Sequence, residues 1–355
     1  MGNTYCGVRC YSLERYYKLD KAQDAGAVDA DSILNRYRLA IEGAVNDSQF
    51  QESPLSQEAK NVMEAGGKRL RPILVLMSCE AVCSQYTTAL PAALSYELAH
   101  EASLVQDDII DNSDLRHDKT TIHKKSGITS AILVSDLLIF DIFNQLAKYG
   151  ETSLTKKKIV RLMSYVARAA NLTIKGEYMD AVLSKQEKIS EEEYLEVAGL
   201  KTGALMAAAS ASGAVIGGAS ERVVDAMYRY GYNLGIAFQI RDDILDITGS
   251  SSKLGKPVMK DLQNNASNIV IVNALERADT YRQNLIHSML YKQWFALSDT
   301  RELQKILNEL KSIDYASKLA EKYTSTSRSC LKVLRASATK DKLVSLTFAL
   351  EIRQT

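Results

Sequence analysis

The sequence is poor in the residues and patterns that interrupt helices. Only four of its 355 residues are prolines, namely Pro54, Pro72, Pro91 and Pro257. Alanine, leucine, glutamate and lysine are plentiful, which favours long helices throughout. No segment alternates apolar and polar residues with a sustained period of two, so no strand is expected. We therefore predict an all-α fold: a single large layered helical bundle.

Other absences exclude whole classes of function. No apolar run reaches the roughly 20 residues of a membrane span, so we expect a soluble chain. The formal net charge is +1, which does not suit a partner such as nucleic acid. The first residues are polar and aromatic, unlike a secretory signal. The five cysteines, an odd number, indicate a reducing compartment, and we expect a cytoplasmic protein.

Sequence signals for the starts and ends of helices divide the chain into helical segments, but no segment has the composition of a linker between domains. We expect a partly ordered extension over residues 1–28 and one all-α domain over residues 29–355. Ser53-Pro54 opens an early helix, and the polar, basic stretch 112–127 is a long loop of the kind that is often functional. Later helices are expected at about 128–148, 155–183, 190–215, 220–247, 261–277, 280–310 and 313–335, followed by a short last one.

Two clusters of carboxylates stand out, each near the end of an apolar run. They are Asp107, Asp108 and Asp111 in the first, and Asp242, Asp243 and Asp246 in the second. On a helix, positions i and i+4 share a face and i+1 flanks it, so the charges repel unless a cation neutralises them. Solvated acidic helix ends would explain one such cluster, but not a repeated one on apolar helices. Oxygen-only ligands favour magnesium, and the two clusters suggest a central cavity between their helices.

Cations occur where the chain turns. The segment Gly66-Gly67-Lys68-Arg69-Leu70-Arg71-Pro72 places three of them at a helix junction, where free backbone amides also favour anions. Lys201 and Lys256 each lie close to a glycine. Taken singly, Lys201 and Lys256 would each be interpreted as a solvated lysine in a turn.

Taken together, these motifs resemble one family, the trans-type polyprenyl diphosphate synthases, and within it the geranylgeranyl and farnesyl diphosphate synthases. The motifs follow the family's order: GGKRLRP, a histidine before DDxxD, an arginine after it, then KT, FQxxDD and GKP. The resemblance covers about residues 30 to 350. It implies an all-α, usually dimeric, magnesium-dependent enzyme that joins isopentenyl diphosphate head-to-tail to an allylic diphosphate. We therefore expect a homodimer.

The resemblance also implies roles for individual residues. The six aspartates would hold three magnesium ions that bridge the allylic diphosphate. The cations on that diphosphate would be Arg116, Lys201 and Lys256. The isopentenyl diphosphate pocket would contain Lys68, Arg71 and His100, with His117 beside them. Thr202 and Gln239 would steady the carbocation.

The chemistry agrees with these roles. Breaking an allylic C–O bond leaves negative charge on pyrophosphate and positive charge on carbon, which metals and lysines at the leaving group stabilise. The carbocation needs an apolar tunnel, and the isopentenyl double bond attacks it. No protein nucleophile is required, which suits a chain without a Ser-His or Cys-His pairing.

The sequence departs from the family pattern at three places. His117, Asp118 and Thr120 stand where the family has a second arginine, a glycine and a proline, and histidine is only partly charged at neutral pH. Ala266 replaces a lysine for which Lys260 could substitute. The family's GQxxD stretch contains a glutamate here, Glu177. We expect these changes to affect substrate affinity rather than the fold.

Small residues near the first cluster predict a long product. In the family the growing chain runs along this helix, and bulky residues before the aspartates close the tunnel. Ala102, Ser103 and Ala99 are small, and the first aromatic residue is Tyr96, so the tunnel gains roughly 9 Å over a floor at Ala102. We expect a product longer than farnesyl, most directly geranylgeranyl diphosphate. Alternatively, the floor is Phe140 or Phe143 on the next helix.

Two other functions share some of these features. A terpene cyclase would share DDxxD and the all-α architecture, but it has no use for GGKRLRP and His100, which serve a second diphosphate. A regulatory subunit of a heteromeric synthase commonly lacks an aspartate cluster. Both clusters are present here, although His117 keeps that alternative open.

Overall fold

The structure is a computed structural model that describes residues 30–47, 53–152, 154–183, 186, 188–248, 267–290 and 297–352. The expected N-terminal extension, Lys256, Lys260 and Ala266 lie outside the described residues.

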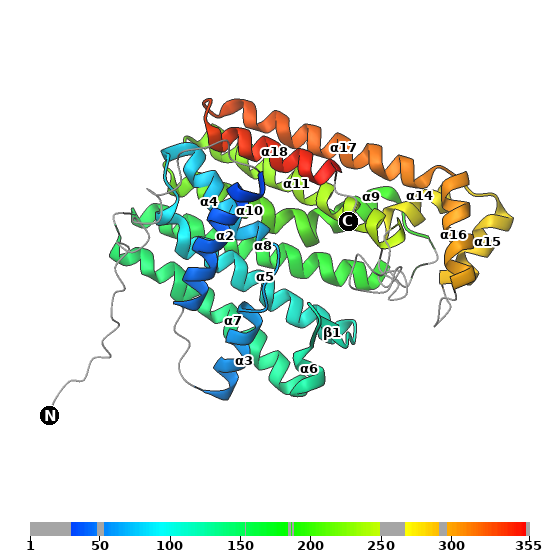
Figure 1. Ribbon diagram of the computed structural model, residues 1–355, viewed down its shortest axis with the longest axis horizontal. Helices are drawn as coiled ribbons and strands as arrows, with labels where there is room; N and C mark the ends of the chain where they lie inside the picture. Colours follow the sequence, from blue (N-terminus) through cyan, green and yellow to red (C-terminus); the bar gives the residue numbers. More distant parts are fainter. Residues whose placement is uncertain are drawn as a thin grey trace.

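The helix α10 (Ala204–Ile216) lies at the centre of the fold, and every one of its residues is buried. It packs against α4 (Leu70–Cys83), α8 (Lys156–Leu183) and α11 (Glu221–Thr248), which surround it in Figure 1. Its alanines, serines and glycine let the neighbouring backbones approach closely. At Gly213, for example, an added Cβ would come 2.2 Å from the carbonyl oxygen of Val75. The small residues of α10 therefore set the tight packing of the bundle.

Other helices complete the layers around this centre (Figure 1). The helix α5 (Leu90–Ile110) packs along α7 (Ile128–Ala147), and α17 (Ser312–Cys330) packs along α11. Further helices in the described part of the chain are α2 (Ala30–Asn46), α3 (Pro54–Met63), α9 (Glu191–Ala198), α14 (Ile269–Arg277), α15 (Thr280–Leu290), α16 (Leu297–Glu309) and α18 (Ala338–Ile352). The predicted all-α architecture is confirmed.

The buried apolar side chains form two clusters that meet along α11. Met227, Tyr230 and Leu234 belong to the larger cluster, which also contains the cores of α4, α5 and α10. Further along α11, Ile240 and Ile244 belong to the second cluster, with α14, α16 and α17. The helix that carries the second aspartate cluster is thus anchored in both parts of the core.

The stretch expected as a loop contains a small β-hairpin. Strands β1 (Leu115–Arg116) and β2 (Lys119–Thr120) pair antiparallel, and the four-residue helix α6 (Ile122–Lys125) follows. At the tip, His117 and Asp118 have φ angles of 50° and 60°, the left-handed values that a tight two-residue hairpin turn requires. The expectation of no strands was wrong here, because a hairpin this short has too few residues to show period-two alternation.

The helix expected at 190–215 is interrupted. Between α9 and α10, residues Gly199–Gly203 form a π-helical turn that contains Lys201 and Thr202. Such wide turns occur frequently at functional sites. Gly176 on α8 allows this turn to come close, since a Cβ at that position would lie 2.6 Å from the backbone nitrogen of Lys201.

Among the described residues, two segments are long and apolar enough to cross a membrane by length and composition alone. In Glu191–Ile216, 89% of the apolar window is buried inside the protein, as in a core helix. In Ile128–Glu151, which contains α7, only 39% of that window is buried. The helix α7 therefore exposes an apolar face.

Candidate active site

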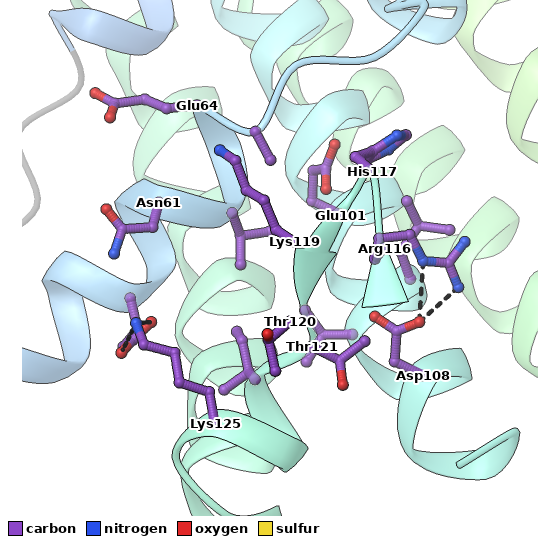
Figure 2. Close-up of a pocket in the computed structure, with 16 residues that line it drawn as sticks. Asn61, Glu64, Glu101, Asp108, Arg116, His117, Lys119, Thr120, Thr121 and Lys125 are labelled. Carbon is purple, nitrogen blue, oxygen red and sulfur yellow. Dashed lines mark hydrogen bonds and ion pairs between the residues drawn. The ribbon is translucent and has the colours of Figure 1, made fainter. Parts of the chain in front are cut away.

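The first aspartate cluster lies at the C-terminal end of α5 and fixes the neighbouring hairpin. Asp108 is buried, and one of its oxygens, Oδ1, accepts hydrogen bonds from Arg116 Nε at 2.9 Å and Nη2 at 2.7 Å. Figure 2 shows this pair, with Arg116 reaching from β1 to α5. The hairpin thereby holds the Arg116 guanidinium against the aspartate cluster.

Asp107 faces a different set of neighbours. Burial, together with the charge of Glu177 on α8, raises the pKa of Asp107 to about 7, while Lys201 and Arg116 act in the opposite direction. The fold therefore brings the end of α5, the middle of α8 and the π-helical turn together, as the sequence predicts for Asp107, Lys201 and Arg116.

The second cluster lies near the end of α11 and is more deeply buried. Asp243 accepts hydrogen bonds from Gln239 Nε2 at 3.1 Å and from the backbone N–H of Ile269 at 2.9 Å. Burial raises the pKa of Asp243 to about 8, although these hydrogen bonds oppose the shift. Asp246 is 2% exposed and Asp242 is half-buried.

Thr202 and Gln239, which the sequence assigns to the same task, are in direct contact. The Thr202 hydroxyl donates a 2.9 Å hydrogen bond to Gln239 Oε1, and Gln239 Nε2 in turn donates to Asp243. This chain fixes which end of the Gln239 amide points to the hydroxyl. Both side chains are therefore oriented before any substrate binds.

Lys201 is held by two carboxylates that sequence reasoning did not include in the site. Its Nζ lies 2.7 Å from Glu177 Oε2 and 3.1 Å from Asp180 Oδ2. Burial lowers the pKa of Lys201, but the charges of Asp180 and Glu177 outweigh it and the pKa is raised. Asp180 also accepts a 2.7 Å hydrogen bond from Ser267 Oγ. The spacing of Glu177 and Asp180, one turn apart on a helix, was the available signal for them.

The GGKRLRP segment forms a loop of left-handed residues before α4. Gly66 and Gly67 have φ angles of 90° and 126°, and Arg69 has a φ angle of 49°. Lys68 is exposed, with its Nζ 5.8 Å from the centre of the Phe238 ring. Arg69 is buried instead and forms ion pairs with carboxylates of α5.

Arg71 stands at the N-terminal end of α4, between the two aspartate clusters. Burial lowers its pKa, while the charges of Glu97, Glu101, Asp107 and Asp242 oppose that shift. In the described part of the chain, its side chain makes no hydrogen bond or ion pair, and its Nε is buried. Arg71 is therefore a cation near four acidic groups without a fixed partner.

His100 and His117 lie near the same loop. Burial lowers the pKa of His100 well below its usual value, and the charges of Arg71, Arg116, Arg69 and His117 lower it further, so the imidazole is neutral. His117, at the exposed tip of the hairpin, lies beside Gly67, where an added Cβ would come 4.0 Å from the His117 Nε2. Arg71, His100 and His117 thus lie near one another, beside the loop that carries Lys68.

A cavity of about 530 Å³ opens beside this region, between α3, α5, the hairpin and α6. Figure 2 shows Glu101, Asp108 and Arg116 on one side and Asn61 and Glu64 on the other. The ion pair between Lys125 and Glu58, at 2.9 Å, closes one end. The cavity thus connects the hairpin to the end of α3.

The aspartates offer oxygen donors only, which suits a hard divalent cation. Among the described residues, no three His, Cys, Asp or Glu side chains stand close enough together to hold a metal ion by themselves. This arrangement suits magnesium, which is commonly bound by one or two carboxylates and completed by water and substrate phosphates. The donor set therefore fits the metal that the sequence predicts.

Tyr96, the residue expected to close a tunnel below Asp107, lies in the core between α5 and α10. The Tyr96 hydroxyl shares a 2.8 Å hydrogen bond with Ser212 Oγ on α10, and Tyr96 is fully buried. Phe140 and Phe143 on α7, the alternative floor, are 67% and 52% exposed in the single chain. Ser103, which shares a helix face with Asp107, is only partly buried.

An all-α bundle with two aspartate clusters and cations beside them is the pattern of the isoprenoid synthases. Comparison with known proteins agrees: residues 52–310 match the family model described as polyprenyl synthetase. The chain is 33% identical over 292 residues to a geranylgeranyl diphosphate synthase of Methanosarcina mazei, covering 82% of this chain and 87% of that protein. It is 32% identical over 295 residues to a geranylfarnesyl diphosphate synthase of Aeropyrum pernix, covering 82% and 92%.

The structural comparison gives the same result. The crystal structure of a geranylgeranyl pyrophosphate synthetase from Pyrococcus horikoshii superposes with a TM-score of 0.85 at 31% identity, covering 91% of this chain and 99% of that chain. The chain therefore belongs to the polyprenyl synthetase family. The predicted family, fold class and enzyme class are confirmed: the protein is a trans-prenyltransferase, and its family implies the use of a divalent metal.

Proposed function

We propose that the protein condenses isopentenyl diphosphate head-to-tail with an allylic diphosphate and releases a trans-prenyl diphosphate longer than farnesyl, most directly geranylgeranyl diphosphate. The observation that carries this proposal is the division of the cations into two groups. Arg116 and Lys201 are held by carboxylates beside the aspartate clusters. Lys68 and Arg71, at the junction of α3 and α4, have no ion pair in the described part of the chain. Two groups of cations suit two diphosphates.

The allylic diphosphate binds, in this proposal, at the aspartate clusters. Arg116 and Lys201 lie there already, oriented by Asp108 and Glu177. Lys256 is a further cation proposed for this diphosphate. Three magnesium ions bound by Asp107, Asp108, Asp111, Asp242, Asp243 and Asp246 would supply the positive charge that stabilises the leaving diphosphate.

The isopentenyl diphosphate binds at Lys68 and Arg71, with His100 and His117 beside them. The neutral imidazole of His100 still has one N–H group, which can donate a hydrogen bond to the diphosphate. The double bond of isopentenyl diphosphate then attacks the allylic carbon. The proton lost from the new chain goes to the departed diphosphate, so the reaction requires no general base from the protein.

Thr202 and Gln239 steady the positive charge on the allylic carbon. Their oxygens are dipoles held in fixed directions by the hydrogen-bond chain to Asp243, and fixed dipoles stabilise developing charge without reorganising. Both residues come from elements that also carry binding groups, the π-helical turn and α11. The reacting carbon is thereby held close to the leaving group.

We also propose that two copies of the chain form a homodimer through α7. This helix exposes the apolar residues Ile128, Ile132, Leu133, Phe140 and Phe143. A face of this kind on a soluble protein usually marks an interaction surface. Replacing both Phe140 and Phe143 with glutamate should convert a dimer to a monomer in sedimentation experiments. Tyr281→Glu, at an exposed position on α15, is the matched control and should leave the mass unchanged.

An incorporation assay tests the function itself. The purified protein is incubated with magnesium, farnesyl diphosphate and labelled isopentenyl diphosphate, and the products are separated by chromatography. We expect a labelled prenyl diphosphate longer than farnesyl. An unlabelled hydrocarbon would indicate a terpene cyclase, and no product at all would favour a regulatory subunit.

A further inference from the structure

Arg69 lies between Lys68 and Arg71 in the chain, but its side chain points into the protein. The Arg69 side chain is 2% exposed, and the residue adopts the left-handed conformation that turns it away from its neighbours. It forms an ion pair with Glu97, lies 3.3 Å from Glu101 Oε1, and donates to the carbonyl oxygen of Met63. This residue therefore joins the end of α3, the start of α4 and the middle of α5.

The two glutamates that Arg69 meets are also neighbours of Arg71. Glu97 and Glu101 stand one turn apart on α5, and they are only 2% and 5% exposed. Their charges act on Arg71 more strongly than those of Asp107 and Asp242. Even so, Arg71 forms no ion pair within the described residues, and the second oxygen of Glu97, Oε2, has no hydrogen-bond partner there.

We infer that Arg69 is a positioning residue for the isopentenyl diphosphate site: by pairing with Glu97 and Glu101, it leaves Arg71 free to bind the diphosphate. This inference rests on the proposed function, which assigns Arg71 to that substrate. An arginine close to a carboxylate pair forms strong, charge-assisted hydrogen bonds. Burial and the charge of Glu97 raise the pKa of Glu101 to about 8, so Glu101 is largely protonated near neutral pH. Without Arg69, the buried Glu97 carboxylate would be uncompensated, and Arg71 is the cation placed to pair with it.

Removing Arg69 alone should therefore act on one substrate. In Arg69→Met, we expect KM for isopentenyl diphosphate to rise about tenfold or more, the scale of one lost charged hydrogen bond, while KM for the allylic diphosphate stays within about twofold. Arg69→Lys keeps the charge and should stay near the wild-type KM. Circular dichroism and thermal unfolding report whether each variant is folded.

A rescue variant separates this role from a merely structural one. Adding Glu97→Gln and Glu101→Gln to Arg69→Met removes the acidic groups that would capture Arg71, so KM for isopentenyl diphosphate should fall back towards the wild-type value. A structural role would not be rescued, because the contact with Met63 remains absent. An unrescued KM, or equal changes in KM for both substrates, overturns the inference. If Arg69→Met does not fold, the triple variant decides by itself: a KM for isopentenyl diphosphate near the wild-type value supports the inference, and a raised KM overturns it.

The variant Arg71→Met shows whether a failed test lies in the inference about Arg69 or in the proposed function on which that inference rests. If KM for isopentenyl diphosphate is unchanged in Arg71→Met, the assignment of Arg71 in the proposed function is wrong. If that KM rises but Arg69→Met leaves it unchanged, only the role of Arg69 is wrong.

Discussion

The hydroxyl of Tyr96 on α5 and that of Ser212 on α10 share a buried 2.8 Å hydrogen bond below the first aspartate cluster. Tyr96 is fully buried, and the small residues Ala99, Ala102 and Ser103 lie between it and Asp107 on α5. This contact joins the two helices at the depth where the growing chain should stop.

Changing this contact should change the product length. We expect Tyr96→Ala to lengthen the main product by at least one isoprene unit, because it removes the ring that closes the tunnel. Tyr96→Phe keeps the ring, loses only the hydrogen bond to Ser212, and should keep the wild-type length.

In the opposite direction, Ser103→Tyr should shift the main product to farnesyl diphosphate. Ala102→Tyr should do the same with a larger loss of stability, because Ala102 is 2% exposed against α7. Chromatography of the products checks all four variants, and an unchanged length in Tyr96→Ala would place the floor elsewhere.

Removing a carboxylate from either cluster should abolish most of the activity. Asp107→Asn and Asp242→Asn each remove a charge that we propose to bind magnesium, and the loss of one such charge-stabilising group typically costs about 100-fold or more in rate. Helicity measured by circular dichroism should not change. Near-normal turnover in either variant, with magnesium as the only metal, would contradict the assignment.

The metal-free protein should become less stable as the pH rises. The folded-state pKa values of Asp107 and Asp243, about 7 and about 8, lie above the ordinary value of 3.8, so the folded chain binds more protons than the unfolded chain in this window. Stability should therefore fall from about pH 4 to about pH 8 and level off above it. Asp107→Asn combined with Asp243→Asn should reduce this slope without abolishing it, because burial also raises the pKa of Glu101 to about 8. Thermal unfolding in the presence of a chelator measures the slope. A slope that is equally steep in the double variant would mean that other groups cause it.

His117→Arg should improve binding of isopentenyl diphosphate. The residue lies at the exposed hairpin tip beside Gly67, where an arginine would add a permanent cation next to Lys68. We expect KM for isopentenyl diphosphate to fall more than kcat changes. Asp118→Asn, at the other position of the same turn, is the control for net charge and should have a smaller effect. If KM does not change in His117→Arg, the side chain at this position does not reach the substrate.

Glu177→Gln should improve binding of the allylic diphosphate. Glu177 lies 2.7 Å from the amine of Lys201 and adds negative charge beside Asp107, where an anionic substrate must bind. Glutamine keeps the size and a hydrogen-bond acceptor but removes the charge, so KM for the allylic substrate should fall. A higher magnesium requirement with an unchanged KM would indicate instead that Glu177 helps to bind the metal.

The sequence was sufficient for those parts of the site that depend on spacing within a helix. Asp107 with Asp111, and Gln239 with Asp243, are one turn apart on α5 and α11, and a helical pattern places them on one face. It was also sufficient for the all-α fold, because so few residues interrupt the helices.

Contacts between elements could not be predicted from spacing. The direction of the Arg69 side chain depends on the left-handed backbone conformation of this residue. Its partner Glu97 lies 28 residues away in the chain, on α5. In the same way, the π-helical turn that presents Lys201 depends on the close approach of Gly176 from α8. Both features arise from tertiary packing, for which the local sequence carries no signal.

The central claim is that one chain binds two diphosphates through two separate groups of cations. Isothermal titration tests it directly: the protein is first saturated with magnesium and an unreactive thiolo analogue of farnesyl diphosphate, and isopentenyl diphosphate is then added. We predict binding of one isopentenyl diphosphate per chain, weakened by Arg71→Met and retained in Lys201→Met. Absence of this second binding event in the wild-type protein, or equal losses in the two variants, would contradict the claim.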